Sequence, residues 1–182
     1  MIPSIEQIEL AIMNYPDFNF RQNLIVFRVT NFSGVVNHEC DCLIMTKSGY
    51  LTEIEIKRSY SDFLNDFKKN HVHDDDRIKD FYFMVHESFK DKVIEKLVEM
   101  KRLPDGVLVY NDDCYITREF GRNHAEKLFG GNVFWMEEHG ELKSYSKGCC
   151  ARKLFLEEQF QLARLGAMRY KNMTEKLIKS IK

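Results

Sequence analysis

The chain has 182 residues, of which 44% are hydrophobic and 30% are charged. This length can bury one substantial core, and the composition is typical of a soluble globular protein. The formal net charge of −1 excludes a chain that binds nucleic acid through a global basic excess, so any such surface must be local.

The first third of the chain predicts a helix followed by antiparallel strands. Residues 3–14 carry an apolar stripe with helical spacing and a serine suited to capping. Residues 23–30 are rich in β-forming side chains. A tight turn at Lys47-Ser48-Gly49 joins two further strands into a hairpin, and a short amphipathic helix follows. These last three elements are predicted at residues 39–46, 50–57 and 61–70.

The rest of the chain predicts strand–helix–strand units and a helical tail. Residues 81–85 form a continuous apolar run, which is typical of a strand buried on both faces. A helix, a buried strand and a last short strand are predicted at residues 88–101, 107–110 and 115–117. Residues 122–147 read as irregular, and a long helix is expected from about residue 148 to the end.

This order of elements predicts an α/β fold with a mixed β-sheet flanked by helices and a C-terminal helical extension. We expect a single domain over residues 1–182, with its core at about residues 1–118 and the helical extension at about residues 121–182.

The cysteines and the N-terminus predict a reduced, cytoplasmic protein. The five cysteines are odd in number and form no Cys-x-x-Cys motif. Cys40 and Cys42 lie two apart on one predicted strand, where they would share a face and could not bridge easily. Adjacent Cys149 and Cys150 lack partners with zinc-site spacing. No apolar run approaches the ~20 residues of a membrane span, and no signal peptide is recognisable, so no membrane partner is expected.

Acidic residues and a lysine gather on the two strands of the predicted hairpin. Because side chains alternate faces along a strand, Asp41 shares a face with Glu39, and Glu55 shares one with Glu53 and Lys57. Pairing through the turn brings Asp41 level with Glu55 and Lys57. Carboxylates beside an ammonium are costly to bury inside a sheet, and a divalent metal would explain them. The competing interpretation is a salt-bridged sheet surface that faces solvent.

Asp41 followed by Glu55-Ile56-Lys57 resembles the active-site signature of the PD-(D/E)XK nuclease superfamily, with Cys40-Asp41 at the Pro-Asp position. This short pattern also occurs by chance, but its surroundings add specificity, because they look like the MmcB-like DNA-repair branch over roughly residues 34–118. The tail loosely resembles that family's closing helix, whereas residues 121–148 look like additional sequence. The segments that carry the resemblance are EIEIKRSYSDFLNDFKK, DFYFMVHESFKDKV, LPDGVLVYND and, in the tail, ARKLFLEEQFQLARLGAMRY.

The resemblance implies a restriction-endonuclease-like core and metal-dependent hydrolysis of phosphodiester bonds in DNA, with Mg²⁺ or Mn²⁺ as cofactor. By position it implies that Asp41 and Glu55 are metal ligands, helped by the backbone carbonyl of Ile56. Lys57 would orient the attacking water or stabilise the transition state. The residue types agree with this chemistry, because Mg²⁺ takes oxygen ligands and keeps several waters, and a metal can activate water.

A glutamate of the first helix is a further candidate ligand, since the superfamily often adds one there. By helical geometry Glu9 falls inside the apolar stripe of Ile5, Ile8 and Ile12, whereas Glu6 lies at its flank. A carboxylate within an apolar stripe needs a partner, so Glu9 is the favoured choice.

Three residues are interpreted as supporting the site rather than as ligands. Glu39 and Glu53 share faces with the candidate ligands, although Glu53 could equally be solvated. Ser59 forms a Ser-x-x-Asp pattern with Asp62 at the start of a predicted helix, where capping is its favoured role.

The residues that would bind DNA stay unassigned. Basic side chains on the predicted helices could reach phosphates, but charged outer helix faces explain them equally well. These are Lys68, Lys69, Arg164, Arg169 and Lys171.

The predicted function is that of a metal-dependent nuclease acting on DNA, in DNA repair. The alternatives are a non-catalytic DNA-binding or scaffolding protein with a nuclease-like fold, and a restriction-type or mobile-element endonuclease. DNA is the expected partner, and the sequence leaves open whether a second copy of the chain forms a homodimer.

Overall fold

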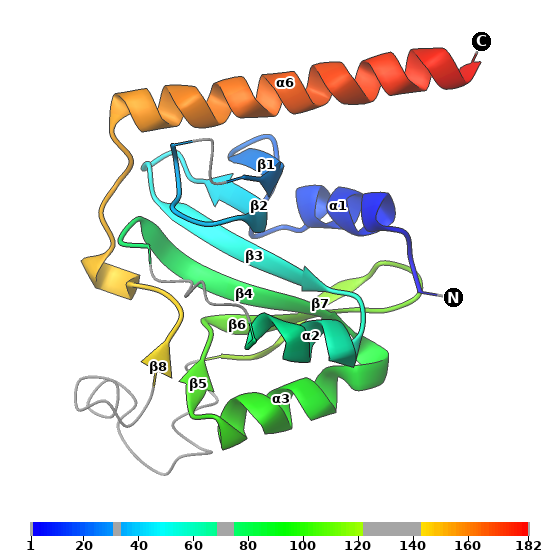
Figure 1. The fold of residues 1–182 in the computed structure, drawn as a ribbon, viewed down its shortest axis with the longest axis vertical. Helices are drawn as coiled ribbons and strands as arrows, with labels where there is room; N and C mark the ends of the chain where they lie inside the picture. The colour runs from blue at the N-terminus through cyan, green and yellow to red at the C-terminus, as the bar shows by residue number, and fades with distance from the viewer. Residues whose placement is uncertain (1, 31–33, 69–74, 122–142, 182) are drawn as a thin grey trace.

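A six-stranded mixed β-sheet lies at the centre of the protein (Figure 1). The computed structural model describes residues 2–30, 34–68, 75–121 and 143–181. The first elements are α1 (Ile5–Asn14), β1 (Leu24–Val29), β2 (Cys40–Met45), β3 (Leu51–Lys57), α2 (Tyr60–Asp66), β4 (Ile78–His86) and the 3₁₀ turn η2 (Glu87–Phe89). There follow α3 (Lys90–Glu99), β5 (Arg102–Leu103), β6 (Gly106–Tyr110), β7 (Ile116–Phe120), β8 (Lys143–Ser144), the 3₁₀ turn η3 (Gly148–Cys150) and α6 (Leu156–Ile181).

The strand order is β1-β2-β3-β4-β6-β7. The first three strands are antiparallel, β3, β4 and β6 run parallel, and β7 returns antiparallel at the far edge. Helices α2 and α3 connect the parallel strands, as parallel pairing requires crossovers. The predicted fold class is thereby confirmed: an α/β protein with a mixed sheet flanked by helices and a C-terminal helix.

The sheet separates two apolar layers. Along β3, Ile54 and Ile56 face the layer that contains α1, whereas Leu51 faces the layer of α2 and α3. The continuous apolar run of β4 divides in the same way, with Phe83 on the α2–α3 side and Met84 on the α1 side. Because side chains alternate along a strand, the continuous apolar run of a central strand contributes to both layers.

The C-terminal helix starts later than the predicted residue 148. Helix α6 begins at Leu156, after an extended stretch whose backbone amides bond to distant parts of the chain. The amide of Arg152 donates to the carbonyl of Asp76 at 3.0 Å, and that of Leu154 donates to the carbonyl of Gly49 at 2.9 Å. These tertiary bonds satisfy the backbone without helix, which sequence propensity alone does not register.

The segment before α6 belongs to the core. The ring of Tyr145 stacks on Phe81 with centroids 4.7 Å apart and meets the edge of Phe83 at 5.2 Å. Tyr145 is buried, and β8 beside it pairs with β5. Part of the predicted extension thus completes the hydrophobic layer on the α2–α3 face.

Helix α6 is held to the sheet by its N-terminal half. Leu162 is fully buried, and Gly166 lies against the side chain of Val26 on β1. Near its start, Glu158 bonds to Arg152 at 2.7 Å and to Arg77 at 3.3 Å, and the bonds from Arg152 lower the pKa of Glu158 to about 2. Figure 1 shows the C-terminal part of α6 extending away from the sheet. None of the helices in the described ranges is both long enough and apolar enough to span a bilayer.

We predict that Tyr145→Ala lowers the free energy of unfolding by about 3–5 kcal/mol, because it empties a site between two core phenylalanines. Tyr115→Ala is the control, since Tyr115 is 70% exposed and its loss should change stability by about 0.5 kcal/mol or less. Urea denaturation followed by circular dichroism measures both. Equal stabilities for the two variants would show that Tyr145 is not part of the folded core.

Candidate active site

The register of β2 on β3 brings the predicted carboxylates together. The ladder pairs Cys42 with Ile54, and the next step along the strands places Asp41 opposite Glu55. At this point side-chain oxygens replace backbone carbonyls as the acceptors. Asp41 Oδ2 accepts from the amide of Ile56 at 2.9 Å, and the amide of Asp41 donates to Glu55 Oε1 at 3.3 Å. Both carboxylates are thus fixed where the two strands stop pairing.

Lys57 lies between two acidic side chains. Its Nζ is 2.8 Å from Glu55 Oε2 and 3.0 Å from Asp66 Oδ1, and the three side chains are 3%, 5% and 5% exposed. Burial alone would lower the pKa of Lys57, but the charges of Glu55 and Asp66 raise it above its usual value. Lys57 therefore stays an ammonium. The role of Asp66 was not predicted, although its position three residues after Phe63 places it on the buried side of α2.

The site carries more negative charge than Lys57 offsets. Burial raises the pKa of Asp41, as do the charges of Asp62 and Asp66, against the opposing effects of the Ile56 amide and Lys57. A carboxyl group in this situation gains from any added cation.

Glu9 on α1 is buried, as its place in the apolar stripe predicts. Its Oε1 accepts from Arg28 Nε at 3.0 Å, whereas the side chain of Glu6 is 64% exposed and lies 3.6 Å from Arg28. Burial raises the pKa of Glu9, and the charge of Asp41 contributes in the same direction. The preference for Glu9 over Glu6 agrees with this burial. Its partner Arg28 was not singled out from the sequence.

The interpretation of the hairpin as a solvated surface is wrong. All seven residues of β3 are buried. Glu53, for which solvation was an alternative, is completely buried, and His38 Nε2 lies 2.9 Å from both of its carboxylate oxygens. Glu53 thus fastens the segment before β2 to the centre of the sheet.

Ser59 is confirmed as the cap of α2. Its Oγ accepts from the amide of Asp62 at 3.1 Å. The reciprocal bond of a capping box is shifted by one residue, because Asp62 Oδ2 accepts from the amide of Arg58 at 3.3 Å. Ser59 therefore positions the helix that carries Asp66.

The predicted alternation of faces fails at Cys40. This side chain packs in the layer of α2 and α3, whereas Cys42 packs on the α1 side. Cys40 pairs with Val29 on β1, and Val29 follows Arg28, whose φ of 56° lies in the left-handed region. The period of two is broken on both strands at this point, because Val29 packs in the same layer as Val26, and Cys40 packs in the same layer as Leu43.

A cavity of about 250 Å³ opens beside the carboxylates. The predicted supporting residue Glu39 is exposed on its wall. The cavity joins acidic groups of β2 and β3 to basic groups of β1 and α6. Its lining consists of Arg28, Val29, Thr30, Glu39, Cys40, Asp41, Glu55 and Arg169.

The donor set suits a hydrated ion rather than an enclosed one. In the part of the chain that the structure describes, no three His, Cys, Asp or Glu side chains are grouped closely enough to hold a metal by themselves. Asp41 and Glu55 line the same cavity, and Mg²⁺ commonly keeps several waters while taking one or two carboxylates. The excess of negative charge at Asp41 fits such a cation.

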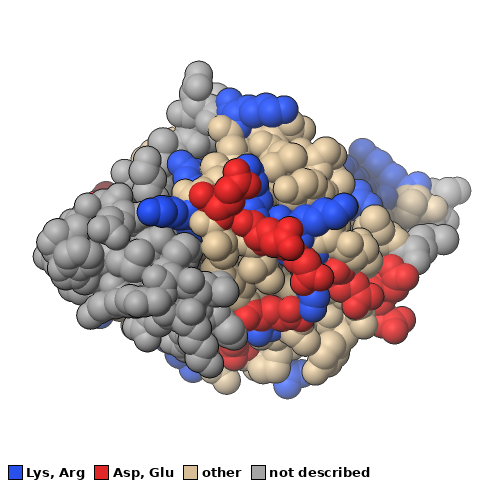
Figure 2. All heavy atoms as spheres, turned by 90° about the horizontal axis from the view of Figure 1, so that it is seen from below, with Lys and Arg blue, Asp and Glu red and all other residues tan. Residues whose placement is uncertain are grey.

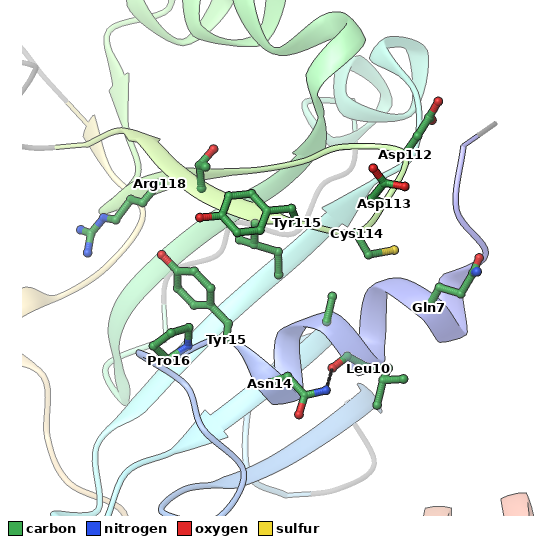
Figure 3. A pocket seen from close by; sticks show the side chains of 13 residues that line it. Gln7, Leu10, Asn14, Tyr15, Pro16, Asp112, Asp113, Cys114, Tyr115 and Arg118 are labelled. Carbon is green, nitrogen blue, oxygen red and sulfur yellow. Dashed lines mark hydrogen bonds between the residues drawn. The ribbon is translucent and has the colours of Figure 1, made fainter.

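A larger hollow of about 980 Å³ lies elsewhere, between α1 and the turn from β6 to β7. Figure 3 shows Tyr15 and Pro16 at the end of α1, with Tyr115 and Arg118 across from them. None of the predicted site residues lines this hollow. Its lining among the described residues includes no lysine, so the chemistry predicted from the sequence does not belong there.

Among the described residues, the face on the side of α3 carries no continuous basic patch (Figure 2). Figure 2 shows this face, on the side of α3, with a band of Asp and Glu crossing it between separate groups of Lys and Arg. This mixed pattern accords with the net charge of −1.

We predict that Asp41→Asn is as stable as the wild type or more stable at pH 7 in EDTA, by at most about 1 kcal/mol. The folded state raises the pKa of Asp41, so its ionisation lowers the free energy of unfolding as the pH rises from 3.8 to the folded pKa. Asparagine keeps the acceptor for the Ile56 amide without the charge. The advantage should vanish below about pH 3.8.

Magnesium should raise the melting temperature of the wild type but not that of Asp41→Asn, because a ligand stabilises only the form that binds it. Thermal unfolding with and without Mg²⁺ measures this. Equal stabilisation of both proteins would place the ion elsewhere.

No family model and no curated protein matches this chain. The chain is similar to a solved structure of a protein of unknown function from Silicibacter pomeroyi. The two share 15% identity over 68% of this chain and 81% of the other, with a TM-score of 0.36. A likeness of this degree supports no statement about activity.

Proposed function

We propose that this chain is a metal-dependent deoxyribonuclease of the PD-(D/E)XK type, similar to the MmcB-like branch and acting in DNA repair. The observation that supports the proposal is the meeting of Asp41, Glu55 and Lys57 at the end of the β2–β3 ladder, beside an open cavity. A solvated hairpin surface would not need buried, mutually bonded charges at this point.

Asp41 and Glu55 would hold Mg²⁺ or Mn²⁺ together with the backbone carbonyl of Ile56. A bound ion supplies a Lewis acid and a water of lowered pKa. The chain itself contributes a fixed ammonium: Lys57 uses two of its three donors on Glu55 and Asp66, which leaves one for a phosphoryl oxygen.

A reducing compartment is part of the proposal. The cysteines whose side chains the structure describes, Cys40, Cys42, Cys114 and Cys150, are free thiols. This supports a cytoplasmic location.

We predict cleavage of at least one DNA form in Mg²⁺ or Mn²⁺ and none in EDTA, measured on linear, nicked, branched and single-stranded DNA. Asp41→Asn and Glu55→Gln should abolish cleavage, because each removes a charged ligand while keeping the shape of the side chain. Glu95→Gln on α3 is the matched control, since Glu95 is exposed and distant in sequence from the site, and it should cut like the wild type.

Wild-type protein that neither binds Mg²⁺ or Mn²⁺ in calorimetry nor cuts any DNA form would favour the non-catalytic DNA-binding alternative. Unchanged cleavage by Glu55→Gln would refute the mechanism, because β3 presents no other carboxylate at the end of the ladder.

We predict that Lys57→Met lowers turnover by about 30- to 1000-fold, the effect of losing one transition-state donor worth about 2–4 kcal/mol. It should also lower the free energy of unfolding by about 3–5 kcal/mol, because it leaves buried carboxylates without their cation. The double variant Lys57→Met, Asp66→Asn should regain part of the stability but none of the turnover. Recovery of turnover together with stability would show that Lys57 acts only through the fold.

A further inference from the structure

Arg169 reaches from α6 across β1 into the wall of the candidate site. It lines the same cavity as Asp41 and Glu55. Its Nη2 donates to the carbonyl of Arg28 at 2.7 Å, which fixes the guanidinium at this edge of the sheet. Its Nε is buried and has no hydrogen-bond partner within the described residues. A buried donor of a charged group is costly to leave unpaired, so an acceptor is expected to approach it.

Arg28 of β1 lines the same cavity and carries a second guanidinium. Its side chain is 53% exposed and is oriented by Glu9, whose Oε1 accepts from Nε at 3.0 Å. This bond uses one of the five donors of the group, and Nη2 lies 3.6 Å from Glu6, so further donors remain for another acceptor. The basic side of the cavity therefore comes from β1 and α6, whereas its acidic side comes from β2 and β3.

The size and charge of the cavity indicate what it accepts. About 250 Å³ is below the range of pockets that enclose a drug-sized molecule, but it is open to one phosphate group of a longer chain. Asp41 and Glu55 alone would repel a phosphate. Paired guanidinium donors attract it and match its geometry, which arginine does better than lysine.

We propose that Arg169 and Arg28 together bind a backbone phosphate of DNA next to Asp41 and Glu55, so that α6 forms part of the substrate site. This inference rests on the proposed function and names the residues that hold its substrate. Arg169 contributes a donor fixed by its bond to β1, and Arg28 contributes an adjustable one. Helix α6 is then required for binding DNA and not only for completing the fold.

The test is fluorescence anisotropy with a labelled DNA duplex of about 20 base pairs, in EDTA so that no cleavage occurs, over a series of KCl concentrations. Arg169→Ala should weaken binding about five- to tenfold near 0.1 M salt and reduce the slope of log Kd against log salt by about 0.9, the value for one lost phosphate contact. Arg164→Ala is the matched control, because Arg164 is exposed on the same helix and does not line the cavity. Its slope should equal that of the wild type.

A second variant separates binding from the seating of α6. Arg169→Gln keeps part of the aliphatic stem and a polar amide but lacks the charge, so it should bind DNA as weakly as Arg169→Ala while its melting temperature stays near that of the wild type. Wild-type affinity in Arg169→Gln, or equal losses in Arg164→Ala and Arg169→Ala, would overturn the inference alone. Wild-type protein that neither binds nor cuts DNA would overturn the proposed function with it.

Discussion

The ion pair of Lys57 with Glu55 and Asp66 is the constraint on which the candidate site depends. Three charged side chains are almost fully buried there, and breaking such a group by removing one member costs several kcal/mol. The group ties the end of β3 to the last residue of α2. Because α2 starts at its Ser59 cap immediately after β3, this short connection has little freedom once the pair forms. The ammonium is thereby held in place by the fold itself.

The end of the β2–β3 ladder provides the second half of the site. Where backbone pairing stops, the carboxylate of Asp41 accepts from the amide of Ile56 on β3, and the carboxylate of Glu55 accepts from the amide of Asp41 on β2. The strands stay joined although their backbones no longer pair. This arrangement exposes carboxylate oxygens at a cavity without leaving amides unsatisfied. Burial, together with the charges of Asp62 and Asp66, raises the pKa of Asp41, and a divalent ion would offset both effects.

Local patterns predicted much of this, and tertiary contacts explain what they missed. The period of two and the tight turn predicted that Asp41 lies level with Glu55, and the helical stripe predicted the burial of Glu9. The alternation fails where Cys40 pairs with Val29, next to Arg28 with its positive φ, and no residue type in the sequence predicts that conformation there. Arg169 reaches the cavity only because α6 crosses β1. The carbonyl of Arg28, to which Arg169 donates, lies 141 residues away in the sequence. No local period encodes such a contact.

Arg28 connects the two ends of the chain at this cavity. Its guanidinium bonds to Glu9 of the first helix, and its carbonyl accepts from Arg169 of the last. A left-handed non-glycine residue costs about 1–3 kcal/mol and persists where its surroundings over-determine it. The bonds of Arg28 to α1 and α6 hold it in this conformation, so the backbone conformation of Arg28 and the packing of α6 on β1 stabilise each other. Without α6, Arg28 would lose the bond from Arg169, which is one of the two that hold its strained conformation. The cavity would also lose Arg169 from its lining.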